Sequence, residues 1–334
     1  MIYFSLIIIN LILFFSLSKI SRIINIYDKP DGKLKIHNKK IPLVGGVLFF
    51  INLIFLLLLQ LFFLDDFLMF QDVLFSKREI ASTIIFIVTF FIIGVFDDRY
   101  KVSPLTRLSL IIIFSIFLMS INQNLVVQNF TLSFYENRIF LNEFSIIFTI
   151  FCILILINAL NFYDGINGQS GTLYILAFTF LYYVSGFNYF YLVLILVLVF
   201  ILFLNYSNKI FFGDSGVYLI SSIFIISLIY EYNVTKNIIY ADEIFFLFLF
   251  PGLDLVRLTI ERLFSNKNIF YGDRNHFHHY LIKKYSMLIS NLLLVIFNLL
   301  PMTLYYIGIS FYYILVSFLI TYFIILVYLR KFKN

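Results

Sequence analysis

The feature that most constrains this chain is a series of eleven apolar stretches separated by short polar loops. The stretches lie at 2–18, 43–64, 80–96, 105–122, 144–160, 172–185, 189–206, 217–231, 244–263, 286–307 and 309–329. A helix needs about 20 apolar residues to cross a bilayer. Eleven crossings and their connecting loops therefore account for the whole length of the chain and leave no residues for a separate globular domain. We therefore predict an all-α polytopic membrane protein of about eleven transmembrane helices, in which residues 1–334 form a single integral-membrane domain.

The composition excludes a soluble enzyme. Only 13% of the residues are charged, whereas soluble domains have about 25%. The single cysteine, Cys152, lies in an apolar stretch, so an intramolecular disulfide is excluded. The first stretch has Lys19 and Arg22 after it and no basic flank before it, which is typical of a retained anchor rather than a cleaved signal.

The basic residues divide unequally between the two sides that the crossings define. The loops that begin with 19–42 and alternate from there carry 20 Lys and Arg residues, and the other loops carry four. Cytoplasmic loops are the ones enriched in basic residues, so the amino terminus is expected outside and the carboxyl terminus in the cytoplasm. The net charge of +6 is explained by this asymmetry, and we expect no nucleic-acid partner. All four histidines fall on the basic side, so an active site is expected on the cytoplasmic loops.

The first cytoplasmic loop combines bases with a glycine pair. It contains Lys33, Lys35 and His37, and Gly45-Gly46 opens the next apolar stretch. A plain juxtamembrane loop explains the lysines. It does not explain the histidine or the glycines, and a glycine pair at the start of a helix would let backbone amides approach an anion.

Acidic and amide side chains recur at the membrane boundary in three further loops. Asp97-Asp98 follows an apolar stretch directly, with Lys101 three residues later, and a later loop supplies Asp214 between glycines. Between them, one dense polar segment contains Asn158, Asn161, Asp164 and Asn167. Interfacial solvation, a glycine-rich turn and an N-cap explain each feature alone. Together the carboxylates are hard oxygen ligands suited to Mg²⁺, which indicates phosphate chemistry.

The last long cytoplasmic loop carries a histidine cluster. A break at Pro251-Gly252 is expected to send the rest of that helix out of the membrane. The loop then reads Arg274, His276, His278 and His279 in short succession. Zinc binding stays open for such a cluster, but the loop has no cysteine. We favour a clamp for an oxyanion or pyrophosphate.

These loops, taken in order, resemble a known family. The sequence contains Asp-x-Pro…His…Pro…Gly-Gly, Asp-Asp-x-x-Lys, Asn-Ala-x-Asn-x-x-Asp-Gly, Gly-Asp-x-Gly and His-x-His-His between about 28 and 280. This series is similar to that of the polyprenyl-phosphate N-acetylhexosamine-1-phosphate transferases. The His-x-His-His form resembles the N-acetylhexosamine branch more than the phospho-MurNAc-pentapeptide transferase of peptidoglycan synthesis.

The resemblance implies a membrane transferase. Such an enzyme moves N-acetylhexosamine-1-phosphate from a UDP-sugar to undecaprenyl phosphate and releases UMP, which initiates a lipid-linked glycan such as O-antigen or capsule. It would work in the bacterial inner membrane with Mg²⁺, or Mn²⁺ in its place, and family members are often homodimers.

The resemblance also assigns roles to residues. Asp97 and Asp98 match the family's paired catalytic acids and Asp214 matches its metal ligand. The residues expected to bind substrate are Lys33, Lys35, His37, Lys101, Asn158, Asn161, Asp164, Asn167, Arg274, His276, His278 and His279. For the reaction we favour direct attack by the lipid phosphate, because its second pKa near 6 leaves much of it dianionic. A covalent intermediate on an aspartate is the alternative.

The chain departs from the family pattern at three positions. Asn167 stands where Asp is usual, Gln169 where Leu is common, and Val217 where Ser is usual. A transporter or lipid-linked-glycan flippase is the competing function. Transporters usually place ionisable groups near the middle of the bilayer, whereas here these groups gather at one face.

Overall fold

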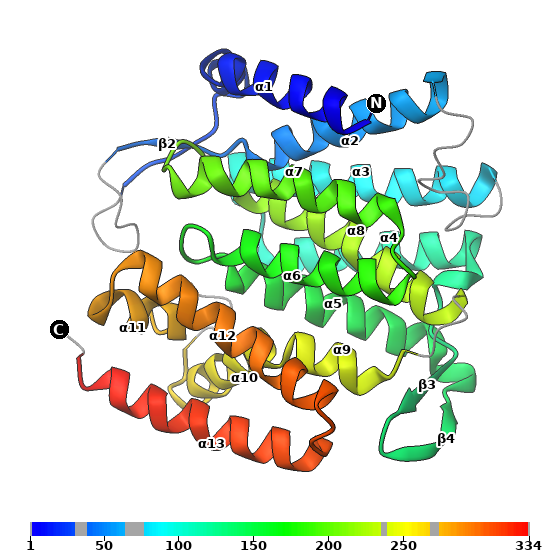
Figure 1. Ribbon diagram of the computed structural model, residues 1–334, viewed down its shortest axis with the longest axis vertical. Coiled ribbons are helices and arrows are strands. Elements are labelled where there is room, and N and C mark those ends of the chain that lie inside the picture. The colour runs from blue at the N-terminus through cyan, green and yellow to red at the C-terminus, as the bar shows by residue number, and fades with distance from the viewer. Residues whose placement is uncertain (1, 31–38, 64–76, 235–238, 268–273, 333–334) are drawn as a thin grey trace.

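The computed structural model describes residues 2–30, 39–63, 77–234, 239–267 and 274–332, and almost all of its elements are helices (Figure 1). Lys33, Lys35 and His37 lie outside the described residues. The helices are α1 (Ile2–Ile24), α2 (Gly45–Phe63), α3 (Lys77–Tyr100), α4 (Pro104–Ile121), α5 (Ser145–Tyr163), α6 (Gln169–Val184), α7 (Tyr189–Tyr206), α8 (Gly213–Val234), α9 (Ala241–Leu247), α10 (Leu249–Phe264), α11 (Phe277–Lys284), α12 (Met287–Tyr306) and α13 (Phe311–Arg330).

Every predicted apolar stretch lies on a helix or, for 244–263, on the pair α9 and α10. Among the described residues, eight helices are long and apolar enough to cross a membrane. Large apolar side chains on the outermost helices are exposed, as with Phe15 on α1 and Tyr313 on α13, which are 79% and 76% exposed. Apolar side chains that face outward over whole helices are expected of a protein surrounded by lipid. The chain is therefore an all-α, multi-pass membrane protein. The count of eleven crossings stays a prediction, because α6, α9 and α10 are shorter than a full span.

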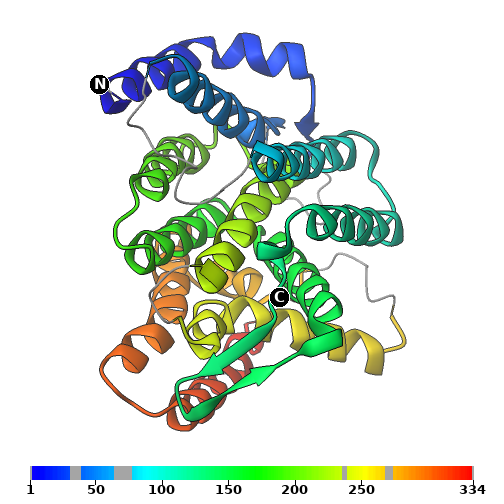
Figure 2. The ribbon, with the colours of Figure 1, turned by 90° about the vertical axis from the view of Figure 1, so that its right-hand side faces the viewer.

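Helix α8 is the centre of the bundle (Figures 1 and 2). Of its most apolar stretch 89% is buried, against 17 to 50% for the other seven long helices. Its first turn packs against α2 and α3 at two glycines. A Cβ at Gly46 would lie 2.4 Å from the backbone nitrogen of Gly216, and a Cβ at Gly94 would lie 2.4 Å from Cα of Ser215. Only glycine allows the helices to come this close.

The glycine pair at the start of α2 therefore has a different role from the anion site that we predicted. The amides of Gly45 and Gly46 donate to the carbonyls of Phe211 and Phe212, at 3.0 and 3.2 Å. These donors are used by the segment that leads into α8. The hypothesis that they bind an anion is wrong. Both amides already donate to backbone carbonyls, and the backbone of residues 211–216 fills the space beside the two glycines.

The apolar stretch 244–263 breaks as expected, but a few residues earlier than predicted. Phe248 separates α9 from α10, with φ of −111° and ψ of 12°. Pro251 then stands in the first turn of α10. A proline ring clashes with the carbonyl four residues before it, here that of Leu247, so the break precedes the proline itself.

A short pair of β-strands lies at each end of the bundle. At one end β1 (Tyr27–Asp28) pairs with β2 (Ile41–Pro42). At the other end β3 (Asn129–Leu132) and β4 (Tyr135–Phe140) form an antiparallel hairpin (Figure 2). The backbone amide of Ser133 at the hairpin tip donates to Asp242 of α9 at 2.8 Å, which ties the hairpin to the bundle.

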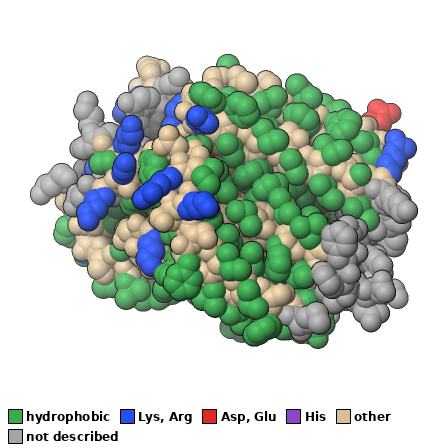
Figure 3. Space-filling view, turned by 90° about the horizontal axis from the view of Figure 1, so that it is seen from above, with side chains coloured by type: hydrophobic (Ala, Val, Ile, Leu, Met, Phe, Trp, Pro, Cys, Tyr) green, Lys and Arg blue, Asp and Glu red, His purple; other side chains and the backbone are tan. Residues whose placement is uncertain are grey.

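The charged side chains gather at the ends of the helices, and one end is the more basic. Viewed onto α1 and its neighbours, Lys and Arg side chains cluster at one end of a broad apolar face (Figure 3). This distribution agrees with the asymmetry of basic residues in the sequence. Which end faces the cytoplasm stays a prediction.

Candidate active site

A cavity of about 480 Å³, lined by both polar and apolar side chains, opens at the end of the bundle where α3, α5 and α7 end and α8 begins. Segments far apart in the sequence meet there. Seven of the predicted site residues line it: Asp98, Lys101, Asn161, Asp164, Asn167, Asp214 and His279. With Asp28 of β1, which also lines the cavity, four carboxylates from β1, α3, the α5–α6 loop and α8 share this space with a lysine and several amides.

Asp98 is fixed by the start of α8. Its two carboxylate oxygens accept hydrogen bonds from the backbone amides of Asp214 and Ser215, at 2.8 and 3.0 Å. The first amides of a helix have no partner within the helix and carry a partial positive charge, so a carboxylate is stabilised there. Gly213 makes the approach possible. Its φ is +71°, and a Cβ on it would lie 2.7 Å from Oδ2 of Asp98.

Asp97 does not line the cavity. Its Oδ2 pairs with Arg107 of α4 at 2.5 Å, and its Oδ1 accepts a hydrogen bond from the amide of Val102 at 2.9 Å. Arg107 also donates to the hydroxyl of Tyr218 on α8. Successive residues of a helix point about 100° apart, so two neighbouring acids reach different surroundings. Asp97 joins α3, α4 and α8 rather than lining the cavity.

Asp164 lies in the loop between α5 and α6. The hydroxyl of Ser170 donates to its Oδ1. The pKa of Asp164 is raised to about 6, mainly by burial; the hydrogen bond from Ser170 opposes the shift, and the charge of Asp98 adds to it. A carboxylate with a pKa this close to neutrality is typical of a binding or catalytic site.

The amides around the cavity connect this loop to the end of α7. Nδ2 of Asn167 donates to Oδ1 of Asn208 at 2.6 Å, and the amide of Gly168 donates to Oδ1 of Asn205 at 2.6 Å. Asn205 and Asn208, which were not among the predicted site residues, also line the cavity. Their position just before the loop that carries Asp214 was the available signal. Asn158 does not reach the cavity, because its side chain bonds to the carbonyl of Leu154 in its own helix.

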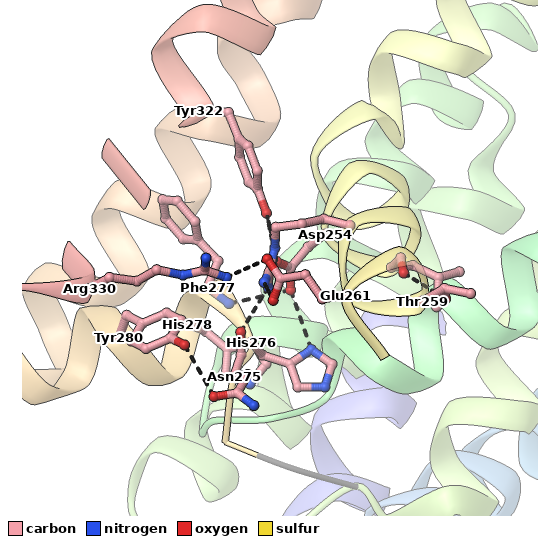
Figure 4. A network of polar contacts seen from close by, with 12 residues as sticks. Asp254, Thr259, Glu261, Asn275, His276, Phe277, His278, Tyr280, Tyr322 and Arg330 are labelled. Carbon is pink, nitrogen blue, oxygen red and sulfur yellow. Dashed lines mark hydrogen bonds and ion pairs between the residues drawn. The ribbon is translucent and has the colours of Figure 1, made fainter. Parts of the chain in front are cut away.

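The histidine cluster is held beside the cavity by a network that joins α10, α11 and α13 (Figure 4). At its centre is Asp254, which is 6% exposed. Its carboxylate pairs with Arg257 at 2.6 Å, accepts a hydrogen bond from the hydroxyl of Tyr322 at 2.7 Å, and lies 3.3 Å from Nδ1 of His276. Arg257 reaches on to the carbonyl of Asn275 at 2.8 Å. A buried ion pair with further hydrogen bonds fixes the loop that carries the histidines.

The three clustered histidines are placed differently. His279 lines the cavity, whereas His276 is 7% exposed and contacts Asp254. His278 is 2% exposed and packs directly against Gly165 of the α5–α6 loop. Arg274 is partly buried beside the cluster and does not line the cavity.

The donor set suits one kind of metal site. Within the described residues, no group of three or more His, Cys, Asp and Glu side chains could hold an ion by itself. Mg²⁺ is usually held by one or two carboxylates together with water and substrate phosphates. Asp214 beside Asp98 and Asp164 fits that arrangement, and it does not fit a closed cage of protein ligands.

Comparison with known proteins agrees with this geometry. Residues 80–231, which carry all the carboxylates of the cavity except that of Asp28, match the model of glycosyl transferase family 4. An undecaprenyl-phosphate alpha-N-acetylglucosaminyl 1-phosphate transferase of Escherichia coli O157:H7 is 26% identical over 285 residues, covering 82% of this chain and 73% of the relative. A probable undecaprenyl-phosphate N-acetylglucosaminyl 1-phosphate transferase of Bacillus subtilis is 26% identical over 263 residues, covering 76% and 69%. The segment that carries these carboxylates is therefore similar to glycosyl transferase family 4, and most of the chain is similar to the two transferases named above.

Proposed function

We propose that the protein transfers N-acetylhexosamine-1-phosphate from a UDP-sugar to undecaprenyl phosphate and releases UMP. The observation that carries the proposal is the shared cavity of Asp98, Asp164 and Asp214 at the end of an apolar bundle. One substrate is a lipid and the other is soluble in water, so their phosphates can meet only at the membrane surface. The printed names of the relatives support the same reaction.

The reaction needs no covalent intermediate on the protein. An oxygen of the lipid phosphate attacks the β-phosphorus of the UDP-sugar, and the bond from that phosphorus to the bridging oxygen breaks. UMP leaves with the bridging oxygen, and the sugar keeps its bond to the β-phosphate. The lipid phosphate is largely dianionic at neutral pH and needs little help from a base. The geometry of Asp98 supports direct attack, because both of its oxygens are engaged by α8.

The cavity residues would then bind and orient the two phosphorylated substrates. We propose that Asp214, with Asp98 beside it, holds Mg²⁺, which would neutralise diphosphate charge as the transfer proceeds. Asn161, Asp164 and Asn167 would face the nucleotide. Lys101 and His279 would face the phosphates, and Lys33, Lys35 and His37 are proposed to complete this side.

The cellular setting belongs to the same proposal. The basic end of the bundle would face the cytoplasm, with the amino terminus outside, and the membrane would be the bacterial inner membrane. The product would initiate a lipid-linked envelope glycan. A homodimer is proposed from the family resemblance alone.

Purified protein in detergent, supplied with undecaprenyl phosphate, Mg²⁺ and a panel of UDP-N-acetyl sugars, tests the proposal through UMP release. We expect UMP with at least one sugar and only when the lipid phosphate is present. In Asp214→Asn turnover should fall at least 100-fold, whereas Glu136→Gln on the exposed strand β4 should leave it unchanged. A folded protein that releases no UMP from any sugar contradicts the function. An Asp214→Asn variant with normal turnover at limiting Mg²⁺ contradicts the metal assignment.

A further inference from the structure

Gln169 is a buried amide that the proposed chemistry does not yet use. It is the first residue of α6 and is only 2% exposed. A buried amide without hydrogen bonds is costly, so its partners reveal what the position requires. Its side-chain nitrogen Nε2 lies 3.2 Å from Nδ1 of His278. The contact joins the loop that carries Asp164 to the histidine cluster more than 100 residues later.

This contact decides where the ring proton of His278 lies. In this orientation of the amide the nitrogen of Gln169 can only donate, so Nδ1 of His278 is the acceptor and carries no proton. The rotated amide would present Oε1, which has no hydrogen-bond partner among the described residues, and would reverse the assignment. In a neutral imidazole the remaining proton is then on Nε2. His278 is thus selected as the tautomer whose Nε2 is a donor.

The surroundings keep the ring neutral. Burial lowers the pKa of His278 well below its usual range, and positive charge on His279 and His276 lowers it further. The rings of those two histidines lie 4.3 and 5.1 Å away, centre to centre. Asp254 and Arg257 act on the ring in opposite directions, and Asp254 is engaged by Arg257 and Tyr322. A second proton on His278 is therefore disfavoured.

Nε2 of His278 lies against Gly165, behind the wall of the cavity. A Cβ on Gly165 would lie 1.8 Å from this nitrogen, so Gly165 leaves the room that the ring occupies. Gly165 itself lines the cavity. Nε2 is buried and has no hydrogen-bond partner within the described part of the chain. A buried donor without a partner, next to a binding cavity, indicates that a ligand supplies the acceptor.

We propose that Gln169 is a positioning residue that fixes His278 as the Nε2–H tautomer, so that this ring donates a hydrogen bond to an oxygen of the bound sugar nucleotide. The inference rests on the proposed function for the identity of the ligand. The tautomer does not depend on the identity of the ligand, because it follows from the orientation in which the amide nitrogen of Gln169 faces His278. Gln169 would act on the substrate only through the histidine.

Nuclear magnetic resonance of protein with ¹⁵N-labelled histidine reads the tautomer directly. A nitrogen that carries a proton and one that does not resonate far apart, and the His278→Asn variant identifies the signals of that ring. We expect a protonated Nε2 and a bare Nδ1 near neutral pH, and a shift of the Nε2 signal when the UDP-sugar is added. A protonated Nδ1 in the wild-type protein would overturn the inference. An Nε2 chemical shift that does not change when the UDP-sugar is added would overturn it as well.

Variants of Gln169 separate positioning from packing. Gln169→Met keeps the length of the side chain but removes the donor, so the two tautomers should mix and kcat/KM should fall about tenfold, which corresponds to one hydrogen bond. Gln169→Glu offers an acceptor instead, which should move the proton to Nδ1 or add a second one. Asn298→Leu is the matched control, because Asn298 is a buried amide that, like Gln169, interacts with Tyr163.

The Asn298→Leu control should leave the His278 signals unchanged, even if it lowers stability. If Gln169→Met leaves the tautomer unchanged, Gln169 does not position the ring and the inference fails.

The proposed function and this inference can fail separately. Wild-type protein that releases UMP but carries the Nδ1–H tautomer contradicts only this inference, whereas an inactive wild-type protein with the expected tautomer contradicts the proposed function and the assigned ligand.

Discussion

Asp98 of α3 accepts hydrogen bonds from the backbone amides of Asp214 and Ser215, so one carboxylate fixes the helix start that presents another. Asp98, at the end of α3, thus provides the hydrogen-bond acceptors for amides in the first turn of α8 that have no partner within that helix. It also couples stability to activity at this point. A change in Asp98 alters its own charge and the position of Asp214 together.

We predict that Asp98→Asn loses both stability and activity. An asparagine offers one acceptor oxygen and no charge to the helix terminus, so the free energy of unfolding should fall by about 2 kcal/mol. Turnover should fall at least 100-fold. Thermal unfolding in detergent and UMP release measure the two effects. Glu79→Gln, at the opposite end of the same helix, is the control, and an Asp98→Asn variant with unchanged Tm would contradict the proposed support of α8.

Arg107 should matter through Asp97 rather than through substrate. In Arg107→Met the buried carboxylate of Asp97 loses its charged partner, which should cost about 3 kcal/mol of stability. In the double variant with Asp97→Asn the cost should be smaller than the sum of the single costs, because no charge is left buried. Chemical or thermal unfolding of the four proteins gives the coupling. Additive effects would show that the 2.5 Å pair contributes nothing specific.

The sequence predicted the helices well, because an apolar stretch at the membrane has few alternatives to a helix. It also predicted that Asp98, Asp164 and Asp214 come together, since all three lie at the same boundary of neighbouring stretches. It could not separate Asp97 from Asp98, because the direction of a side chain depends on the rotation of its helix against its neighbours. The link from Asp254 to Tyr322, 68 residues later, and that from Gln169 to His278 depend on tertiary packing that no local pattern records.

Close helix packing at Gly46 gives a stability prediction. In Gly46→Ala the new methyl group would meet the backbone of α8 at 2.4 Å, so α8 must move and the protein should lose about 2 kcal/mol or more. Gly252→Ala on α10 is the matched control, since a Cβ there meets nothing within 4 Å. It should be neutral or stabilising by up to about 1 kcal/mol, because alanine favours the helix. Equal Tm values for the two variants would contradict the described packing.

Activity should depend on the ionisation of Asp164. Its pKa is raised to about 6, so the carboxylate is charged above that pH and neutral below it. If the charged form binds, kcat/KM should fall as the pH drops below about 6. Ser170 donates to Asp164 and lowers its pKa, so Ser170→Ala should raise that pKa and move the acidic limb to higher pH.

The lipid phosphate titrates in the same range, but its contribution is the same in both proteins. The difference between the two pH profiles therefore reports on Asp164. If the pH profiles of kcat/KM coincide for wild type and Ser170→Ala, ionisation of Asp164 does not cause the fall in activity at acidic pH.

The most direct test of the account follows the β-phosphate of the sugar nucleotide. A UDP-N-acetyl sugar labelled with ³²P in that phosphate is incubated with the protein, undecaprenyl phosphate and Mg²⁺, and lipid and water phases are separated. The account predicts that the label moves to the lipid while unlabelled UMP appears in water in equal amount. Label that stays in the water phase as UDP or as the intact sugar nucleotide would contradict transfer of a sugar-1-phosphate.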